Sequence, residues 1–147
     1  MLIAMAKLRK FSESLPMLLL KAREQAMVHF RPMLRPHGLT EQQWRVLRAL
    51  QDLGPLTAAR LSKECAILAP SMTRIVRRLA DAQLITTERS TLDQREVVVN
   101  ITASGTELMR SLGPGIEEQY ALIRDQLSAS EYAALTRALK RLIAIDD

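Results

Sequence analysis

Apolar residues recur at helical spacing near the start of the chain. Between residues 12 and 36 they lie three or four positions apart, at Leu15, Leu19, Ala22, Ala26, Phe30 and Met33. This spacing predicts an amphipathic helix, which Pro32 is able to kink and Pro36 to end. A second apolar row passes through Leu18, Met27 and Leu34. A helix that is apolar on two faces needs cover on both, which indicates a partner subunit as well as the protein's own core.

A second helix is predicted after a turn at His37-Gly38. Thr40 and Gln43 have the spacing of a capping box, which opens a helix, and Gly54-Pro55 ends it. The expected buried face of this helix consists of Trp44, Val46, Leu47, Leu50 and Leu53.

Two shorter helices joined by a tight turn are predicted next. The first runs from Ala58 to Glu64, residues 66–69 form the turn, and the second runs from Pro70 to Gln83. The second helix has an apolar face of Met72, Ile75, Val76 and Leu79. This pair is a candidate helix-turn-helix.

The rest of the chain predicts a hairpin and two helices. Leu84–Thr87 and Val97–Ile101 are β-branched runs that flank a polar tip, Glu88–Glu96. A long helix from Thr102 toward Leu127 is expected to bend or break at Gly113-Pro114-Gly115, and Ser128 with Glu131 caps a last helix that reaches Ile145. The predicted fold is mainly α with a small β-hairpin, which has the order of a winged helix-turn-helix.

Composition and charge limit the kinds of function that the protein can have. The 147 residues are 48% hydrophobic and carry a net charge of +5, which fits one globular domain with an acidic partner such as nucleic acid or an anionic membrane surface. Residues 1–101 hold 16 basic and 9 acidic groups, whereas residues 102–147 hold 5 and 7. The positive charge therefore accompanies the predicted helix-turn-helix and hairpin.

Several classes of protein are excluded or disfavoured by the sequence. One cysteine forms no intrachain disulfide, and one cysteine with two histidines makes no structural zinc cage. The chain shows neither a secretory signal nor an 18-residue apolar stretch, so we expect a cytoplasmic protein. It also has no phosphate-binding glycine loop and no catalytic triad in motif context, so we expect neither an enzyme nor a cofactor.

The polar residues of the second short helix and the hairpin suit duplex DNA. A helix fits the major groove, where arginine pairs with guanine, and a hairpin arginine can reach phosphate or the minor groove. Asp93 is placed to orient Arg95 by a charge-assisted hydrogen bond. The candidate DNA-binding residues are Ser71, Thr73, Arg74, Arg77, Arg78, Arg89, Asp93 and Arg95.

Residues 56–105 resemble the MarR family of winged-helix transcription regulators. They reproduce the family's helix, turn, recognition helix and wing, with the D-x-R element at Asp93-Gln94-Arg95 and an I-T-x-x-G closing motif at residues 101–105. Family members most often have a second arginine at the position of Gln94, so this wing has one cation fewer. Upstream, residues 21–50 resemble the repressors of homoprotocatechuate degradation within this family.

The resemblance implies a homodimer that binds a pseudo-palindromic operator. Residues 40–101 would form the DNA-binding lobe, and residues 10–36 and 102–147 the dimerisation helices, which agrees with the two-faced first helix. Regulators of this kind commonly repress aromatic or heteroaromatic acid catabolism and bind aromatic carboxylates between the dimer helices and the DNA lobe. Residues that offer a cation, hydrogen-bonding groups and apolar walls for such a ligand are Arg23, Thr40, Gln43, Trp44, Ile67, Leu68 and Pro70.

Cys65 suggests redox sensing as an alternative function. Some regulators of this family sense peroxide through a cysteine, but they resemble one another in placing it in the first helix with tyrosines nearby. Cys65 instead follows a short helix beside Ala66 and Ile67. We therefore expect a small buried residue, with a redox-sensing repressor as the alternative.

Overall fold

The computed structural model describes residues 7–145, which form six α-helices, two 3-10 helices and one antiparallel sheet of three strands. The elements in chain order are η1 (Phe11–Glu13), α1 (Leu15–Leu34), η2 (Arg35–His37), α2 (Glu41–Leu53), β1 (Leu56–Thr57), α3 (Ala58–Cys65), α4 (Ala69–Asp81), β2 (Ile85–Arg89), β3 (Val97–Ile101), α5 (Ala103–Gln126) and α6 (Ala129–Ile143). None of the helices in this range has the length and apolar character needed to cross a membrane.

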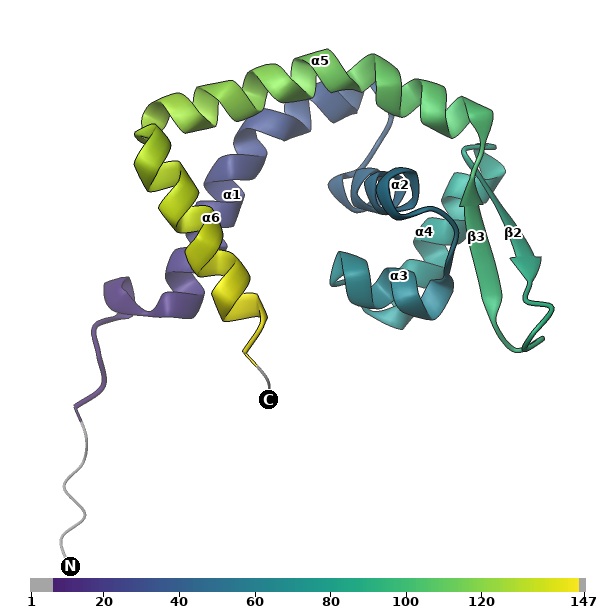
Figure 1. Cartoon of the computed structure of the whole chain (residues 1–147), viewed down its shortest axis with the longest axis horizontal. Coiled ribbons are helices and arrows are strands. Elements are labelled where there is room, and N and C mark those ends of the chain that lie inside the picture. Colours follow the sequence, from purple (N-terminus) through teal and green to yellow (C-terminus); the bar gives the residue numbers. More distant parts are fainter. Residues whose placement is uncertain (1–6, 146–147) are drawn as a thin grey trace, which may run out of the picture.

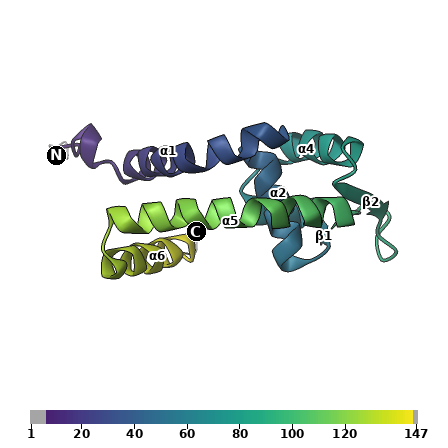
Figure 2. The same ribbon diagram turned by 90° about the horizontal axis from the view of Figure 1, so that it is seen from above.

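The helices form an arch (Figure 1). Helix α5 spans the top and connects an arm made of α1 and α6 to a lobe made of α2, α3, α4 and the sheet. Seen from above, α6 lies beside α5 at the end away from the lobe (Figure 2). The mainly helical fold with a winged helix-turn-helix, predicted from the sequence, is confirmed.

The first two predicted helices are present with small changes. Helix α1 continues through Pro32 to Leu34, and Gly38, with a φ of 67°, makes the expected turn. Thr40 Oγ1 accepts the N–H of Gln43 at 3.1 Å, and Gln43 Oε1 accepts the N–H of Thr40 at 3.1 Å, which confirms the capping box. The prediction that Leu53 is buried is wrong: it is the last residue of α2 and is 52% exposed, because the helix ends in solvent there.

The sheet contains one strand more than predicted. Strands β2 and β3 pair from Ile85 opposite Ile101 to Arg89 opposite Val97, as the hairpin prediction requires. The short strand β1 pairs with the other edge of β3, so β3 is central. A strand of two residues is too short for a hydrophobic pattern to reveal it.

Helix α5 is continuous from Ala103 to Gln126, so of the two outcomes expected at Gly113-Pro114-Gly115, a bend or a break, the break does not occur. Pro114 removes one backbone donor, but packing against neighbouring elements holds the helix together. A Cβ at position 115 would overlap the Met33 methyl group of α1, which is the end of a flexible side chain and would have to move aside. Gly115 therefore lies where α5 contacts α1.

The core lies mainly in the lobe and where α1 meets α5. Its most completely buried side chains are Leu34, Val46, Leu47, Leu50, Leu61, Met72, Leu79, Ile85 and Val99. In contrast, α6 contains no buried residue. The N-terminal half of α1 also exposes leucines, about half of each side chain at Leu15, Leu18 and Leu20. The arm therefore presents an apolar surface.

Gly105 fixes the junction between the wing and α5. A Cβ at this position would overlap the Leu84 carbonyl oxygen and the Ile101 side chain. We therefore expect Gly105→Ala to lower the free energy of unfolding by about 1–3 kcal/mol, measured by chemical denaturation. Gly113→Ala is the matched control, because nothing lies within 4 Å of the added carbon. An equal loss of stability in both variants would contradict this explanation.

Candidate nucleic-acid interface and ligand cavity

Helix α4 separates an apolar face from a cationic one. Met72, Ile75 and Leu79 point into the core. The residues predicted to contact DNA lie on the other face, where Thr73, Arg74, Arg77 and Arg78 are exposed and Ser71 is half-buried. Arg74 Nη2 donates to Ser71 Oγ at 3.3 Å. The three arginines carry positive charge along a helix that has no acidic residue between positions 70 and 80.

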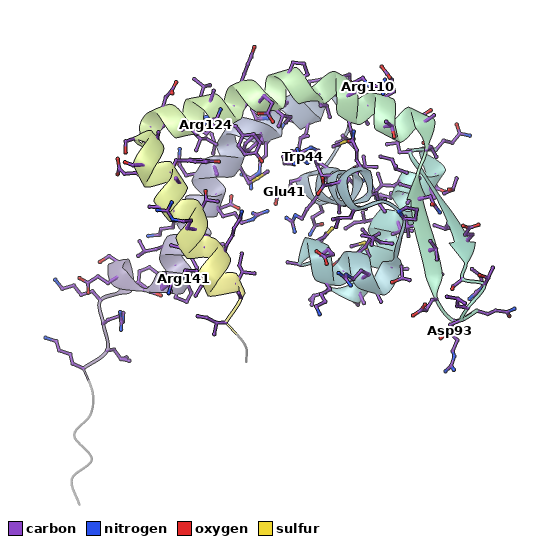
Figure 3. All side chains as sticks on the ribbon, in the orientation of Figure 1. Glu41, Trp44, Asp93, Arg110, Arg124 and Arg141 are labelled. Atoms are coloured by element: carbon purple, nitrogen blue, oxygen red, sulfur yellow. The ribbon has the colours of Figure 1, made fainter. Side chains whose placement is uncertain are left out.

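Hydrogen bonds order the tip of the wing. The Ser90 N–H donates to the Glu96 carbonyl at 2.9 Å, and Arg89 Nη1 donates to the Gln94 carbonyl at 2.8 Å. Asp93 Oδ1 accepts the backbone N–H of Arg95 at 3.0 Å and lies 3.7 Å from Arg95 Nε. Asp93 therefore pairs with Arg95, although its hydrogen bond goes to the backbone rather than to the guanidinium. The Arg95 side chain is 95% exposed, and Figure 3 shows Asp93 at the far tip of the hairpin.

A cavity of about 220 Å³ lies between the arm and the lobe. Its lining comes from α1, α2 and α5 and consists of Arg23, Met27, Glu41, Trp44, Arg45, Arg48 and Tyr120. Phe30 supports the aromatic wall, with ring centroids 5.7 Å from Trp44 and 4.9 Å from Tyr120. Within the described residues, Trp44 Nε1 is the buried side-chain polar atom that lacks a hydrogen-bond partner. Figure 3 shows Trp44 and Glu41 on the side of α2 nearest α1.

The charged groups around the cavity differ in how far they are already paired. Glu41 accepts Arg23 Nη2 at 3.1 Å and Arg31 Nη2 at 3.4 Å, and Glu24 pairs with the same two arginines at 3.3 and 2.9 Å. We call these four residues the α1–α2 ion-pair cluster. The hydrogen bond that Arg31 donates to Glu24 raises the pKa of Arg31, and the cluster joins the arm to the first turn of α2.

Arg48 is the cation most available to an anion in this cavity. Arg45 Nη1 is occupied by the Cys65 carbonyl at 2.8 Å. The guanidinium of Arg48 lies 5.9 Å from the centre of the Trp44 ring, and no carboxylate in residues 7–145 lies within ion-pair distance of it. An aromatic wall beside an unpaired guanidinium is the arrangement that a planar carboxylate requires.

The structure brings together only two of the seven ligand residues proposed from the sequence. Arg23 and Trp44 line the cavity, whereas Thr40 and Gln43 bond each other in the capping box. Ile67 is buried in the core and Leu68 and Pro70 are exposed at the start of α4, so none of the three lines this cavity. These three residues were expected beside Arg23. They instead lie in the turn before α4 and at its start, whereas Arg23 lies on α1.

Five residues of the lining were missed. Glu41 and Arg48 lie three positions before and four positions after Trp44, so helical periodicity around the tryptophan was the signal that could have found them. Arg45 directly follows Trp44, and this periodicity does not point to it. Met27 lies one helical turn after Arg23 on α1. No sequence signal places Tyr120 there, because it comes from α5, far along the chain.

Cys65 is buried, with 3% of its surface exposed. Its thiol lies 3.8 Å from the Arg45 carbonyl oxygen, and burial raises the pKa of the thiol. The prediction of a small buried residue is confirmed. Since the thiolate is the reactive form, this environment disfavours peroxide sensing.

The fold and the α4 and wing surfaces together define a winged-helix DNA-binding protein. Residues 37–96 match the model of the MarR family. The homoprotocatechuate degradative operon repressor of Escherichia coli is 37% identical over 133 residues, which are 90% of each chain, and the regulator FarR of Neisseria gonorrhoeae is 36% identical over 129 residues, 88% of each. The crystal structure of NadR in complex with 4-hydroxyphenylacetate superposes with a TM-score of 0.83 at 33% identity, covering 96% of this chain and 100% of that one.

The chain belongs to the MarR family. It is a DNA-binding transcription regulator and not an enzyme, as the sequence predicted.

Proposed function

We propose that the protein is a homodimeric repressor of an aromatic or heteroaromatic acid catabolic operon, released from its operator by a small aromatic carboxylate. The observation that carries this proposal is the cavity between arm and lobe, where Trp44 and Tyr120 form an aromatic wall beside Arg48, which has no ion-pair partner among the described residues. The name of the E. coli relative and the 4-hydroxyphenylacetate bound by NadR support the same class of ligand.

In this proposal Arg48 anchors the carboxylate and Trp44 stacks on the ring. The buried Trp44 N–H has no hydrogen-bond partner within residues 7–145, so a ligand that shifts the ring would find it an unused donor. Glu41 accepts from a ring hydroxyl while Arg23 holds it in place at 3.1 Å. An effector of this kind forms hydrogen bonds with the polar groups of the cavity and covers the apolar wall of the cavity. The hydrogen bonds to charged groups mainly determine how the effector is oriented.

The DNA-binding lobe comprises residues 40–101. Helix α4 enters the major groove with Ser71, Thr73 and the three exposed arginines, and the wing reaches the flanking backbone or minor groove through Arg89 and Arg95, with Asp93 holding the tip. The exposed cationic faces of both elements support this placement.

Ligand binding affects DNA binding through the position of the lobe. The cavity is lined by α1 and α5 on one side and α2 on the other, and the α1–α2 ion-pair cluster connects the same elements. A ligand that binds better at one separation of arm and lobe shifts the dimer toward that separation. The two copies of α4 then no longer match consecutive major grooves.

Residues 10–36 and 102–147 form the dimer interface in this proposal. Their exposed leucines need cover, notably Leu18 and Leu20 on α1 and Leu135 and Leu142 on α6. We expect sedimentation equilibrium at micromolar concentration to give twice the 16.6 kDa of one chain. We also expect the dimer to protect two half-sites about 10 base pairs apart in a footprint. A monomer bound to a single half-site would refute the dimeric repressor.

A further inference from the structure

The start of helix α4 has an exposed apolar surface that neither the core nor the ligand cavity uses. Leu68 is 80% exposed, whereas its neighbour Ile67 is buried, with 6% of its surface exposed. Ala69 and Pro70, which follow Leu68, are also exposed. Leu68 is thus a large exposed apolar side chain directly before the helix that carries the exposed arginines.

The backbone holds Leu68 in a fixed position. Ile67 N–H donates to the Ser62 carbonyl at 3.0 Å, and the Leu68 carbonyl accepts the Met72 N–H at 2.9 Å. Leu68 is the N-cap residue of α4, and its side chain offers no hydrogen bond to that helix. Pro70 in the first turn has no N–H. This end of α4 therefore offers few donors to a phosphate, and what it presents is apolar.

The charge around this surface indicates what covers it. Arg74, Arg77 and Arg78 follow on the same helix, are exposed, and attract a polyanion rather than an apolar protein partner. In the major groove, the apolar group that a side chain can contact is the 5-methyl group of thymine. A leucine at the leading end of a helix that enters this groove matches that group in chemistry.

We propose that Leu68 reads thymine in the operator by contact between its methyl groups and the thymine 5-methyl group. This inference rests on the proposed function, since it requires α4 to lie in the major groove. Arg74 lies six residues further along, about 9 Å along the helix axis, and in this proposal contacts a different base pair of the same half-site.

Uracil differs from thymine only by this methyl group, which gives a direct test. The probe is the duplex that the wild-type protein selects from a randomised pool, resynthesised with each thymine replaced in turn by uracil. We expect wild-type affinity to fall about threefold to fourfold at one thymine of each half-site, because about one apolar carbon is left uncovered. Leu68→Ala should bind the thymine and uracil duplexes equally at that position.

Two controls separate this contact from general effects. Leu53→Ala removes another exposed leucine, at the end of α2, and should keep the full response to uracil. Leu68→Val keeps a branched apolar side chain and should keep part of the response to uracil. Circular dichroism of Leu68→Ala should match the wild type, since the side chain makes little contact with the fold.

The outcomes distinguish this inference from the proposed function. A wild-type protein that selects a sequence but binds all uracil duplexes as tightly as the thymine duplex overturns the role of Leu68 alone. The same conclusion follows if Leu68→Ala retains the wild-type response to uracil. A wild-type protein that selects no sequence at all overturns the proposed function and this inference with it.

Discussion

Replacing Arg48 with alanine should lower the affinity of the dimer for an aromatic carboxylate roughly 10- to 150-fold, which corresponds to the loss of about 1.5–3 kcal/mol for a hydrogen bond to a charged group. Within residues 7–145, Arg48 is the cavity arginine whose side chain has neither a carboxylate nor a hydrogen-bond partner, and its guanidinium lies over the ring of Trp44. Affinity for operator without ligand should stay near that of the wild type, because Arg48 lies on α2 and not on α4. Calorimetry with 4-hydroxyphenylacetate measures the first effect, and fluorescence anisotropy of labelled operator the second.

Arg23→Ala is the matched comparison, because Arg23 lines the same cavity but is already paired with Glu24 and Glu41. Its effect on ligand affinity should be smaller than that of Arg48→Ala. Arg48→Lys should recover part of the affinity, since lysine keeps the charge but not the planar fork. If Arg23→Ala abolishes ligand binding and Arg48→Ala does not, Arg23 is the anchor, as the sequence first suggested.

Replacing Arg74 with alanine should weaken operator binding by about 1–3 kcal/mol, and binding to random DNA by less. Arg74 is exposed on the outer face of α4, and Ser71 Oγ accepts one of its N–H groups at 3.3 Å, which restricts its side chain before DNA arrives. An arginine held in this way loses less freedom when it pairs with a guanine. Anisotropy titrations with both DNAs at one salt concentration give the two values.

Arg110→Ala is the control for the loss of one positive charge. Arg110 lies on α5 (Figure 3), outside α4 and the wing, and pairs with Glu107 at 2.7 Å, so its replacement should leave both affinities nearly unchanged. Equal losses on operator and random DNA in the Arg74 variant would make Arg74 a phosphate contact and leave base reading to other residues.

The lobe was largely predictable from the sequence because its signals are local. The Thr40–Gln43 capping box, the apolar face of α4 and the β-branched strands each lie within a short window, and each is present in the structure. Errors arose where distant packing decides the outcome. Helix α5 stays intact at Pro114, and Gly115 lies inside this helix beside Met33 of α1.

The ligand cavity was less predictable because it is assembled from three helices far apart in the chain. Arg23 and Trp44 were recognised as a cation and an aromatic wall, and they do share a cavity. Which cation is free depends on ion pairs across helices, such as that between Arg23 and Glu41, which no sequence pattern reveals. Leu68 was taken for a cavity wall, but its side chain points into solvent at the start of α4.

The most direct test of the account is release of the bound operator by an aromatic acid. Wild-type dimer on labelled operator is titrated with homoprotocatechuate, hydroxyphenylacetates, benzoates and hydroxynicotinates, with hydrogen peroxide in a parallel series. We predict that at least one acid releases the DNA at a concentration below about 1 mM, that the Arg48→Ala variant resists this release, and that peroxide has no effect because Cys65 is buried. The account is contradicted if none of these acids binds or releases the operator, or if peroxide releases it and Cys65→Ser prevents that release.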